Sequence, residues 1–126
     1  MADAGLKVLQ PDVAKWGGVT GALDLAATLP AGTVLWPHFM GTAVGQMAAL
    51  SVTAAINADS SGNSGGNSGG NSVCEVDVNS NTLRTELCGS VMEICDGHIS
   101  LAADSGLVCE PDAAALQEFA DHLQRS

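Results

Sequence analysis

The stretch Val34-Leu-Trp-Pro-His-Phe-Met-Gly-Thr-Ala-Val-Gly-Gln-Met47 joins a short apolar run, a histidine and a segment of small residues. A short apolar run bounded by turn residues is typical of a buried strand, and apolar residues three or four positions apart indicate a helix. We therefore predict a strand over 33–36, His38 just beyond its carboxyl end, and a helix from 41 or 42 to about 56.

The same design occurs upstream of this stretch. Val8-Leu-Gln-Pro-Asp-Val-Ala-Lys-Trp-Gly-Gly-Val-Thr-Gly21 places Asp12 where the later unit has His38. It predicts a strand over 7–13 and a helix that runs to about residue 28, with Thr20 as its N-cap. Downstream, Val73-Cys-Glu-Val-Asp-Val-Asn79 predicts a third strand that carries acidic residues. Alternation of strands and helices predicts a parallel α/β architecture.

Three further segments differ from this alternation. Residues 60–72 form a Gly-Gly-Asn-Ser repeat with nothing to bury, which predicts a flexible insertion. Residues 91–101 alternate apolar side chains around Asp96-Gly97, a pair that favours a tight hairpin turn. From Pro111 onward the pattern predicts a short amphipathic helix. The predicted division is 1–90 for the α/β portion and 91–126 for the hairpin and closing helix.

Size and charge exclude several classes of protein. The chain has 126 residues, enough for one small domain but short for a complete α/β barrel of about 250 residues. Its net charge of −10 would be repelled by a nucleic-acid backbone or an anionic lipid, so we expect neither nucleic acid nor membrane as a partner. The N-terminal residues lack the pattern of a signal peptide, and no apolar run reaches the roughly 20 residues of a membrane helix. We therefore expect a cytoplasmic protein.

The four cysteines do not follow a recognised metal-binding pattern. They are Cys74, Cys88, Cys95 and Cys109. No two form a C-x-x-C pair, and the spacings do not suit zinc. Without a secretory signal a disulfide framework is not expected, so we predict free thiols that mostly pack in apolar surroundings. A metal or redox protein built on these cysteines remains an alternative.

Taken together and in order, several motifs resemble a known family. They are Gln10-Pro-Asp12, Lys15-Trp-Gly-Gly-Val-Thr-Gly21, Trp36-Pro-His38 and Cys74-Glu75, followed by Asn81-Thr-Leu-Arg84, Asp96-Gly-His-Ile99 and Ser105-Gly-Leu-Val108. The set resembles the C-terminal part of the barrel domain in the mandelate racemase and muconate lactonizing enzyme family of the enolase superfamily. The resemblance implies a partial (β/α)8 TIM barrel, about strands 6 to 8 with their helices, followed by a C-terminal hairpin and helix.

The resemblance also implies roles for three residues. His38 matches the base that removes a proton beside a carboxylate, Asp12 matches the aspartate paired with it, and Glu75 matches a glutamate that donates a hydrogen bond to the enediolate. Histidine titrates near neutral pH, as such a base must. A donating Glu75 must be protonated, which requires a raised pKa. From the residues alone, Asp12 could equally be a solvated loop acid, His38 a half-buried structural histidine, and Asp77 a rival to Glu75.

The implied activity is that of a Mg²⁺-dependent lyase or isomerase that acts on a small-molecule carboxylate, an acid sugar or hydroxy acid. Dehydration, cycloisomerisation and racemisation are all consistent with it. The family's metal ligands lie on the third to fifth strands, whereas this chain resembles the family only from just before the sixth. We therefore expect that a parent enzyme binds Mg²⁺ and that this chain contains none of the metal ligands. We also expect the full-length form to be a homo-oligomer. The alternative is a catalytically inactive truncated remnant or assembly piece.

Overall fold

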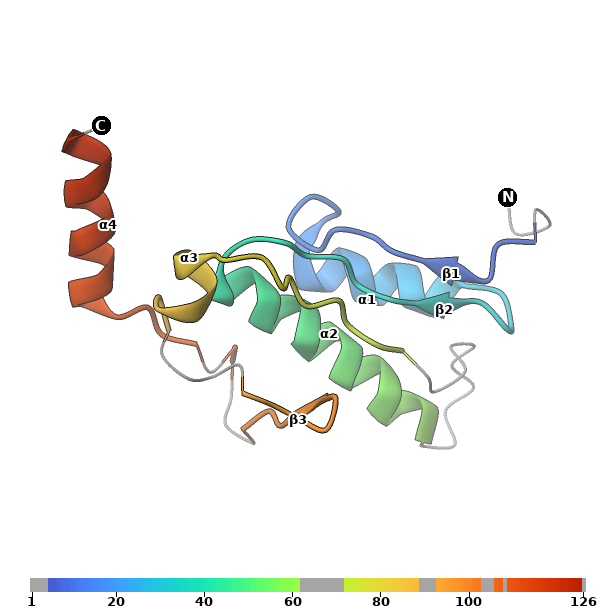
Figure 1. Cartoon of the computed structure of the whole chain (residues 1–126). Helices are drawn as coiled ribbons and strands as arrows, with labels where there is room; N and C mark the ends of the chain where they lie inside the picture. Colours follow the sequence, from blue (N-terminus) through green and yellow to red (C-terminus); the bar gives the residue numbers. More distant parts are fainter. Residues whose placement is uncertain (1–4, 62–71, 89–92, 103–105, 108, 126) are drawn as a thin grey trace.

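A computed structural model describes residues 5–61, 72–88, 93–102, 106–107 and 109–125 of the chain (Figure 1). Within these residues the secondary structure is mixed, with four helices and two small two-stranded sheets. In chain order the elements are β1 (Val8–Leu9), α1 (Gly18–Thr28), β2 (Val34–Leu35), α2 (Ala43–Ser61), α3 (Thr82–Thr85), β3 (Ile94–Cys95), β4 (His98–Ile99) and α4 (Ala113–Arg125). None of these helices is long and apolar enough to cross a membrane.

Strands β1 and β2 pair in parallel, as the sequence predicts. The N–H groups of residues 34, 36 and 38 donate to the carbonyls of residues 7, 9 and 11 at 2.9, 2.8 and 3.0 Å. Regular pairing nevertheless covers only two residues of each strand, fewer than predicted. Pro11 interrupts it because proline has no N–H to donate to the neighbouring strand. The pairing returns as an isolated parallel bridge between Asp12 and His38, so both residues lie at the carboxyl ends of neighbouring strands.

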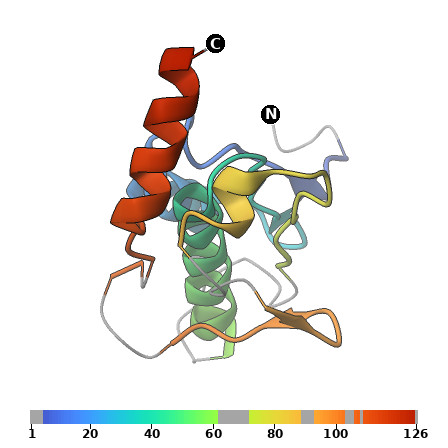
Figure 2. The same ribbon diagram turned by 60° about the vertical axis from the view of Figure 1, so that its left-hand side comes forward.

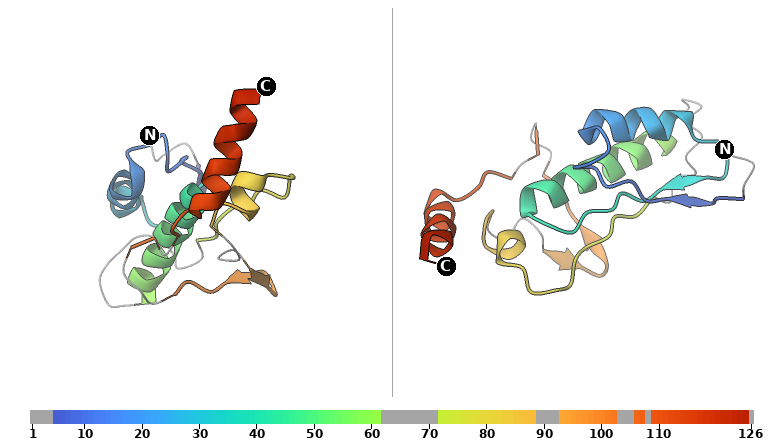
Figure 3. Two further views of the ribbon diagram at one scale, coloured as in Figure 1. Left: turned by 90° about the vertical axis from the view of Figure 1, so that its left-hand side faces the viewer. Right: turned by 90° about the horizontal axis from the view of Figure 1, so that it is seen from above.

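Helices α1 and α2 cover one side of this strand pair, and both views in Figure 3 show them side by side. Small residues on the helices allow close approach, and Leu35 of β2 is fully buried between the layers. The core consists of Val13, Ala22, Ala26, Leu29, Leu35, Ala49, Val52 and Ile56. Helix α2 continues to Ser61, beyond the predicted end at about 56.

Glycines determine how α1 begins. The helix starts at Gly18, and its N-cap is Gly17, with φ of 76° and no side-chain cap hydrogen bond. The prediction of Thr20 as N-cap is therefore wrong. Both Gly17 and Gly18 have positive φ, at 76° and 69°, a conformation that glycine adopts without the strain of a side chain. The chain can thus turn sharply from β1 into α1.

Gly21 is required for a different reason, which is close packing. A Cβ at this position would lie 2.6 Å from the backbone oxygen of Trp16, which cannot rotate away. We expect Gly21→Ala to destabilise the fold by about 1–3 kcal/mol, as overpacking does, measured by urea denaturation. The exposed Thr20→Ala in the same helix should change stability by no more than about 0.5 kcal/mol. A gain in stability for Gly21→Ala, as helix propensity alone predicts, would contradict this packing.

The segment over 73–79 is extended but forms no strand with regular pairing, so the third predicted strand is wrong in that respect. It runs beside β2 in the same direction (Figure 1). Its contacts with the rest of the structure are made largely by side chains, and it leads into α3, a short helix that the sequence did not predict.

The predicted hairpin and closing helix are both present. Strands β3 and β4 pair antiparallel around Asp96 and Gly97, whose φ angles of 51° and 76° suit a tight primed turn. Helix α4 lies at one end of the structure in Figure 1, and its C-terminal end projects beyond the other elements in Figure 2. Its Phe119 packs against the small cluster around Leu87. Most of the Gly-Gly-Asn-Ser repeat, residues 62–71, lies outside the described residues.

Candidate functional site

The imidazole of His38 contacts the carboxylate of Glu75, although the two residues are far apart in the sequence. His38 follows β2, and Glu75 lies on the extended segment that runs beside β2. Nδ1 of His38 meets Oε2 of Glu75 in a short contact, and each side chain is 37% exposed. The pair is therefore held in place by the fold and remains open to a ligand from solution.

This contact assigns the tautomer of His38. An ionised carboxylate can only accept hydrogen bonds, so Nδ1 must carry a hydrogen and donate it to Glu75. In the neutral ring the other nitrogen, Nε2, then holds the lone pair that can take up a proton. Once protonated, the imidazolium would be paired with the negative charge of Glu75. The arrangement is that of a base whose orientation is fixed by a carboxylate.

Glu75 is ionised in this arrangement. Its pKa is lowered chiefly by the hydrogen bond from His38, and the hydrogen bond from Gln10 and the charge of His38 act in the same direction. Gln10 Nε2 donates to Oε1 of Glu75 at 3.0 Å. The expectation of a raised pKa for Glu75 is therefore wrong here, because both carboxylate oxygens accept hydrogen bonds that favour the charged form.

Asp12 lies at the neighbouring strand end, but its carboxylate is held by its own turn. Oδ2 pairs with Nζ of Lys15 at 2.7 Å, and Oδ1 accepts the N–H of Ala14 at 2.9 Å. The pKa of Asp12 is lowered, chiefly by Lys15, with a smaller contribution from the charge of His38. The fold thus brings Asp12, His38 and Glu75 to one place, but the carboxylate on Nδ1 of His38 belongs to Glu75 instead of Asp12.

Removal of Lys15 tests this account of Asp12. In Lys15→Gln the strongest influence that favours the charged carboxylate is lost, so the pKa of Asp12 should rise towards its ordinary value. Carbon-detected NMR titration of the Asp12 carboxyl group measures the change. Lys7→Gln, which removes a charge from the same strand segment, should leave the titration of Asp12 unaltered. An unchanged Asp12 in Lys15→Gln would show that the ion pair does not persist in solution.

Sequence patterns alone do not identify two residues of the site. Gln10 belongs to one of the family-like motifs without an assigned role, yet it donates to Glu75. Gln46 is fully buried in α2, and its Nε2 donates to the backbone oxygen of Glu75 at 2.7 Å. A polar amide within an otherwise apolar helix was the available signal for Gln46.

The described residues do not provide the ligands of a metal ion. No group of three or more histidine, cysteine, aspartate or glutamate residues that could hold a metal occurs among them. The two carboxylates of the site are already engaged, Asp12 by Lys15 and Glu75 by His38. Their donor set therefore does not fit the Mg²⁺ that the family resemblance implies.

The cysteines are free, as predicted. Cys74, next to Glu75, accepts a hydrogen bond from Gln46 Nε2 at 3.2 Å, and burial raises the pKa of its thiol to about 11. It is therefore a neutral thiol at physiological pH and a weak nucleophile. Cys95 is exposed, whereas Cys88 is buried and Cys109 is half-buried.

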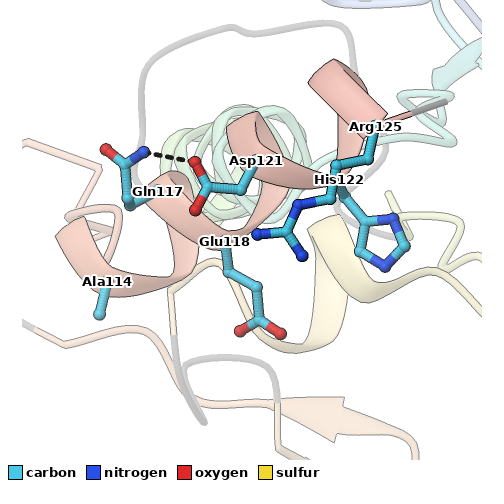
Figure 4. A pocket seen from close by; sticks show the side chains of 6 residues that line it. All are labelled: Ala114, Gln117, Glu118, Asp121, His122 and Arg125. Carbon is cyan, nitrogen blue, oxygen red and sulfur yellow. Dashed lines mark hydrogen bonds between the residues drawn. The ribbon is translucent and has the colours of Figure 1, made fainter.

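A hollow lies along α4, the helix at one end of the structure in Figure 1, and Figure 4 shows it from close by. The residues drawn in Figure 4 all belong to this one helix, and they include Glu118, Asp121, His122 and Arg125. Nε2 of Gln117 donates a hydrogen bond of 2.8 Å to Oδ1 of Asp121, one helical turn away. This hollow is the polar face of an amphipathic helix, and the His38–Glu75 pair is the stronger candidate for a functional site.

A comparison with known sequences identifies the family of this chain. The sequence model of the family described as "Enolase C-terminal domain-like" matches residues 1–115, a range that contains Asp12, His38 and Glu75. Searches of curated proteins and of solved structures returned no significant match. The family resemblance inferred from the motifs is confirmed. The chain belongs to the enolase C-terminal domain-like family and thereby to the enolase superfamily.

Proposed function

We propose that this chain carries the proton-transfer groups of an enzyme that removes the α-proton of a small carboxylate substrate. The observation that carries the proposal is the contact of His38 Nδ1 with the Glu75 carboxylate, with Asp12 on the neighbouring strand end. An acid sugar or hydroxy acid is the class of substrate that the family resemblance implies. Dehydration, cycloisomerisation and racemisation all involve a proton transfer at this carbon.

The geometry gives His38 and Glu75 separate tasks. A proton beside a carboxylate is weakly acidic, so its removal needs a positioned base that titrates near neutral pH. With Nδ1 donating to Glu75, Nε2 of His38 is the atom that would take the proton. The negative charge of Glu75, and more distantly that of Asp12, then stabilises the imidazolium. In this arrangement Glu75 orients the base, the task that the resemblance gives to Asp12.

The proposal includes the architecture that the resemblance implies. The segments 7–12, 34–38 and 72–78 would be about strands 6 to 8 of a partial (β/α)8 barrel, whose carboxyl ends form the site. Mg²⁺, which would hold the substrate carboxylate, would need ligands outside the described residues. No step proposed for His38, Glu75 or Asp12 passes through the metal.

Proton exchange tests this function without knowledge of the final product. The intact protein is incubated with MgCl₂ and a panel of acid sugars and hydroxy acids in D₂O, and the α-proton signal is followed by ¹H NMR. We expect at least one substrate to lose this signal faster than it does without protein. A folded protein that exchanges no member of the panel would overturn the proposal.

A second candidate is a catalytically inactive assembly piece, and the surface beside β1 favours it. An apolar hollow there is lined by Leu9, Leu25 and Leu29 and by two exposed side chains, Leu6 and Trp16, which are 50% and 59% exposed. Parallel sheets are normally covered on both faces, so this surface suits a further strand–helix unit of the same barrel. Under this candidate the protein binds such a unit but exchanges no α-proton. A chain that stays monomeric in sedimentation when mixed with that unit would contradict it.

A further inference from the structure

The position of Glu75 depends on side chains of α2, because the segment that carries Glu75 has no regular strand pairing. Gln46 Nε2 donates to the backbone oxygen of Glu75 at 2.7 Å. Three turns later in α2, Asn57 makes two hydrogen bonds with the backbone of Ser72. Its Nδ2 donates to the oxygen at 2.9 Å, and its Oδ1 accepts from the N–H at 3.1 Å. These amides replace the strand pairing that would otherwise fix this segment.

The burial of Gln46 indicates that its amide does more than fill space. The residue is fully buried, and its Oε1 has no hydrogen-bond partner among the protein atoms of the described part of the chain. A buried polar atom without a partner destabilises a fold, whereas an apolar side chain of the same length would avoid that cost. Packing alone therefore does not explain why residue 46 carries an amide. The hydrogen bonds that its Nε2 donates to Glu75 and Cys74 do explain it.

We propose that Gln46 is a positioning residue, whose amide fixes the backbone of Glu75 so that the carboxylate stays on Nδ1 of His38. Asn57 supports the same segment at Ser72, three residues upstream. Gln46 touches no substrate and acts only through Glu75. The inference deepens the proposed function and rests on it for its catalytic meaning, but the positioning itself can be tested without activity.

The test is Gln46→Met, which keeps the length of the side chain and removes its donor. The hydrogen bond from His38 is the largest cause of the lowered pKa of Glu75. If the variant loosens this contact, the pKa of Glu75 should rise towards its ordinary value, which NMR titration of the Glu75 carboxyl carbon measures. A merely structural amide would leave this titration unchanged in a folded variant.

Ser51→Ala is the matched control in the same helix. It removes a hydrogen bond to the Met47 oxygen within α2 and touches no residue of the Glu75 segment, so the titration of Glu75 should be unaltered. Asn57→Ala should raise the pKa of Glu75 by less than Gln46→Met does, because Asn57 acts three residues away. It should also speed the backbone hydrogen exchange of Ser72.

Each outcome decides the inference. A folded Gln46→Met with an unchanged pKa of Glu75 would overturn it. If that variant does not fold, Asn57→Ala decides alone, and unchanged Glu75 titration together with unchanged exchange at Ser72 would overturn it. A raised pKa of Glu75 in a protein without proton-exchange activity would support the positioning role while the proposed function fails. Proton-exchange activity together with an unchanged pKa of Glu75 in Gln46→Met would support the proposed function while the positioning role fails.

Discussion

Replacing His38 with asparagine should slow the exchange of the substrate α-proton by about 10²–10⁴-fold, the usual contribution of a positioned general base. Asparagine retains a polar side chain that can donate to Glu75, but it has no nitrogen that takes up a proton near neutral pH. The rate is measured as the loss of the α-proton signal in D₂O. Because only the basic nitrogen is removed, the effect should fall on the rate of the chemical step.

The control for this prediction is His98→Asn. His98 is exposed on the β3–β4 hairpin, where its Nδ1 bonds to the backbone oxygen of Asp96 at 2.8 Å. The exchange rate should be unaltered in this variant. If His38→Asn retained the rate of the wild-type protein, another group would have to be the base, and the function proposed for His38 would be wrong.

Glu75→Gln and Asp12→Asn separate the two carboxylates beside His38. A glutamine at 75 can donate to Nδ1, which would favour the tautomer whose Nε2 carries the hydrogen and cannot accept another. Glu75→Gln should therefore reduce the exchange rate more than Asp12→Asn, whose carboxylate is engaged by Lys15. The family resemblance, which pairs Asp12 with the base, predicts instead that Asp12→Asn has the larger effect. If Asp12→Asn reduced the rate as much as Glu75→Gln or more, Asp12 would again be the partner of the base.

Local signals in the sequence account for most of the correct predictions. The Asp96-Gly97 pair is sufficient to specify a tight hairpin turn, and the two apolar runs before Asp12 and His38 predict the parallel strands. The predicted ends were less accurate, since Pro11 interrupts regular pairing before Asp12 is reached. The spacing of apolar residues indicates which side chains are buried. It does not take into account that a proline such as Pro11 has no backbone N–H to donate to the neighbouring strand.

The partner of the base could not be predicted from the sequence because it depends on competition between contacts. Asp12 was expected to hold His38, but Lys15 lies three residues away in the same turn and takes its carboxylate. Glu75 contacts His38 although the two residues lie 37 positions apart in the sequence. Whether a strand-end carboxylate faces its neighbour or its own turn is decided by side-chain geometry, which neither spacing nor motif identity contains.

The burial pattern of α2 shows a similar limit. The apolar spacing of this helix predicts a stripe through Val44, Met47, Ala48, Ser51 and Ala55, but the buried face instead contains Gln46, Met47, Val52 and Ile56. Alanine is frequent all around this helix, so hydropathy gives little information about which face is covered. Hydropathy also does not predict a buried glutamine, although the contact of Gln46 with Glu75 is one of the few that position the site.

Leu35→Ala should produce the largest loss of stability among simple truncations in this chain. Leu35 is fully buried where β2 meets α1 and α2, and among the described residues the main core has only eight members. Removal of a leucine side chain from a rigid core costs about 2–5 kcal/mol, because contacts are lost and the cavity does not fully collapse. Against a total stability of about 5–15 kcal/mol for a typical domain, this loss should shift the urea midpoint strongly.

Two further truncations determine what a loss at Leu35 means. Leu123→Ala, on α4 and 79% exposed, should change stability by no more than about 0.5 kcal/mol. Val34→Ala, one residue before Leu35 and half-buried, should have an intermediate effect, because successive strand residues face opposite sides. If Leu35→Ala cost no more than Leu123→Ala, the two helices would not be packed on β2, and His38 would lose the rigid strand end that its role as a base requires.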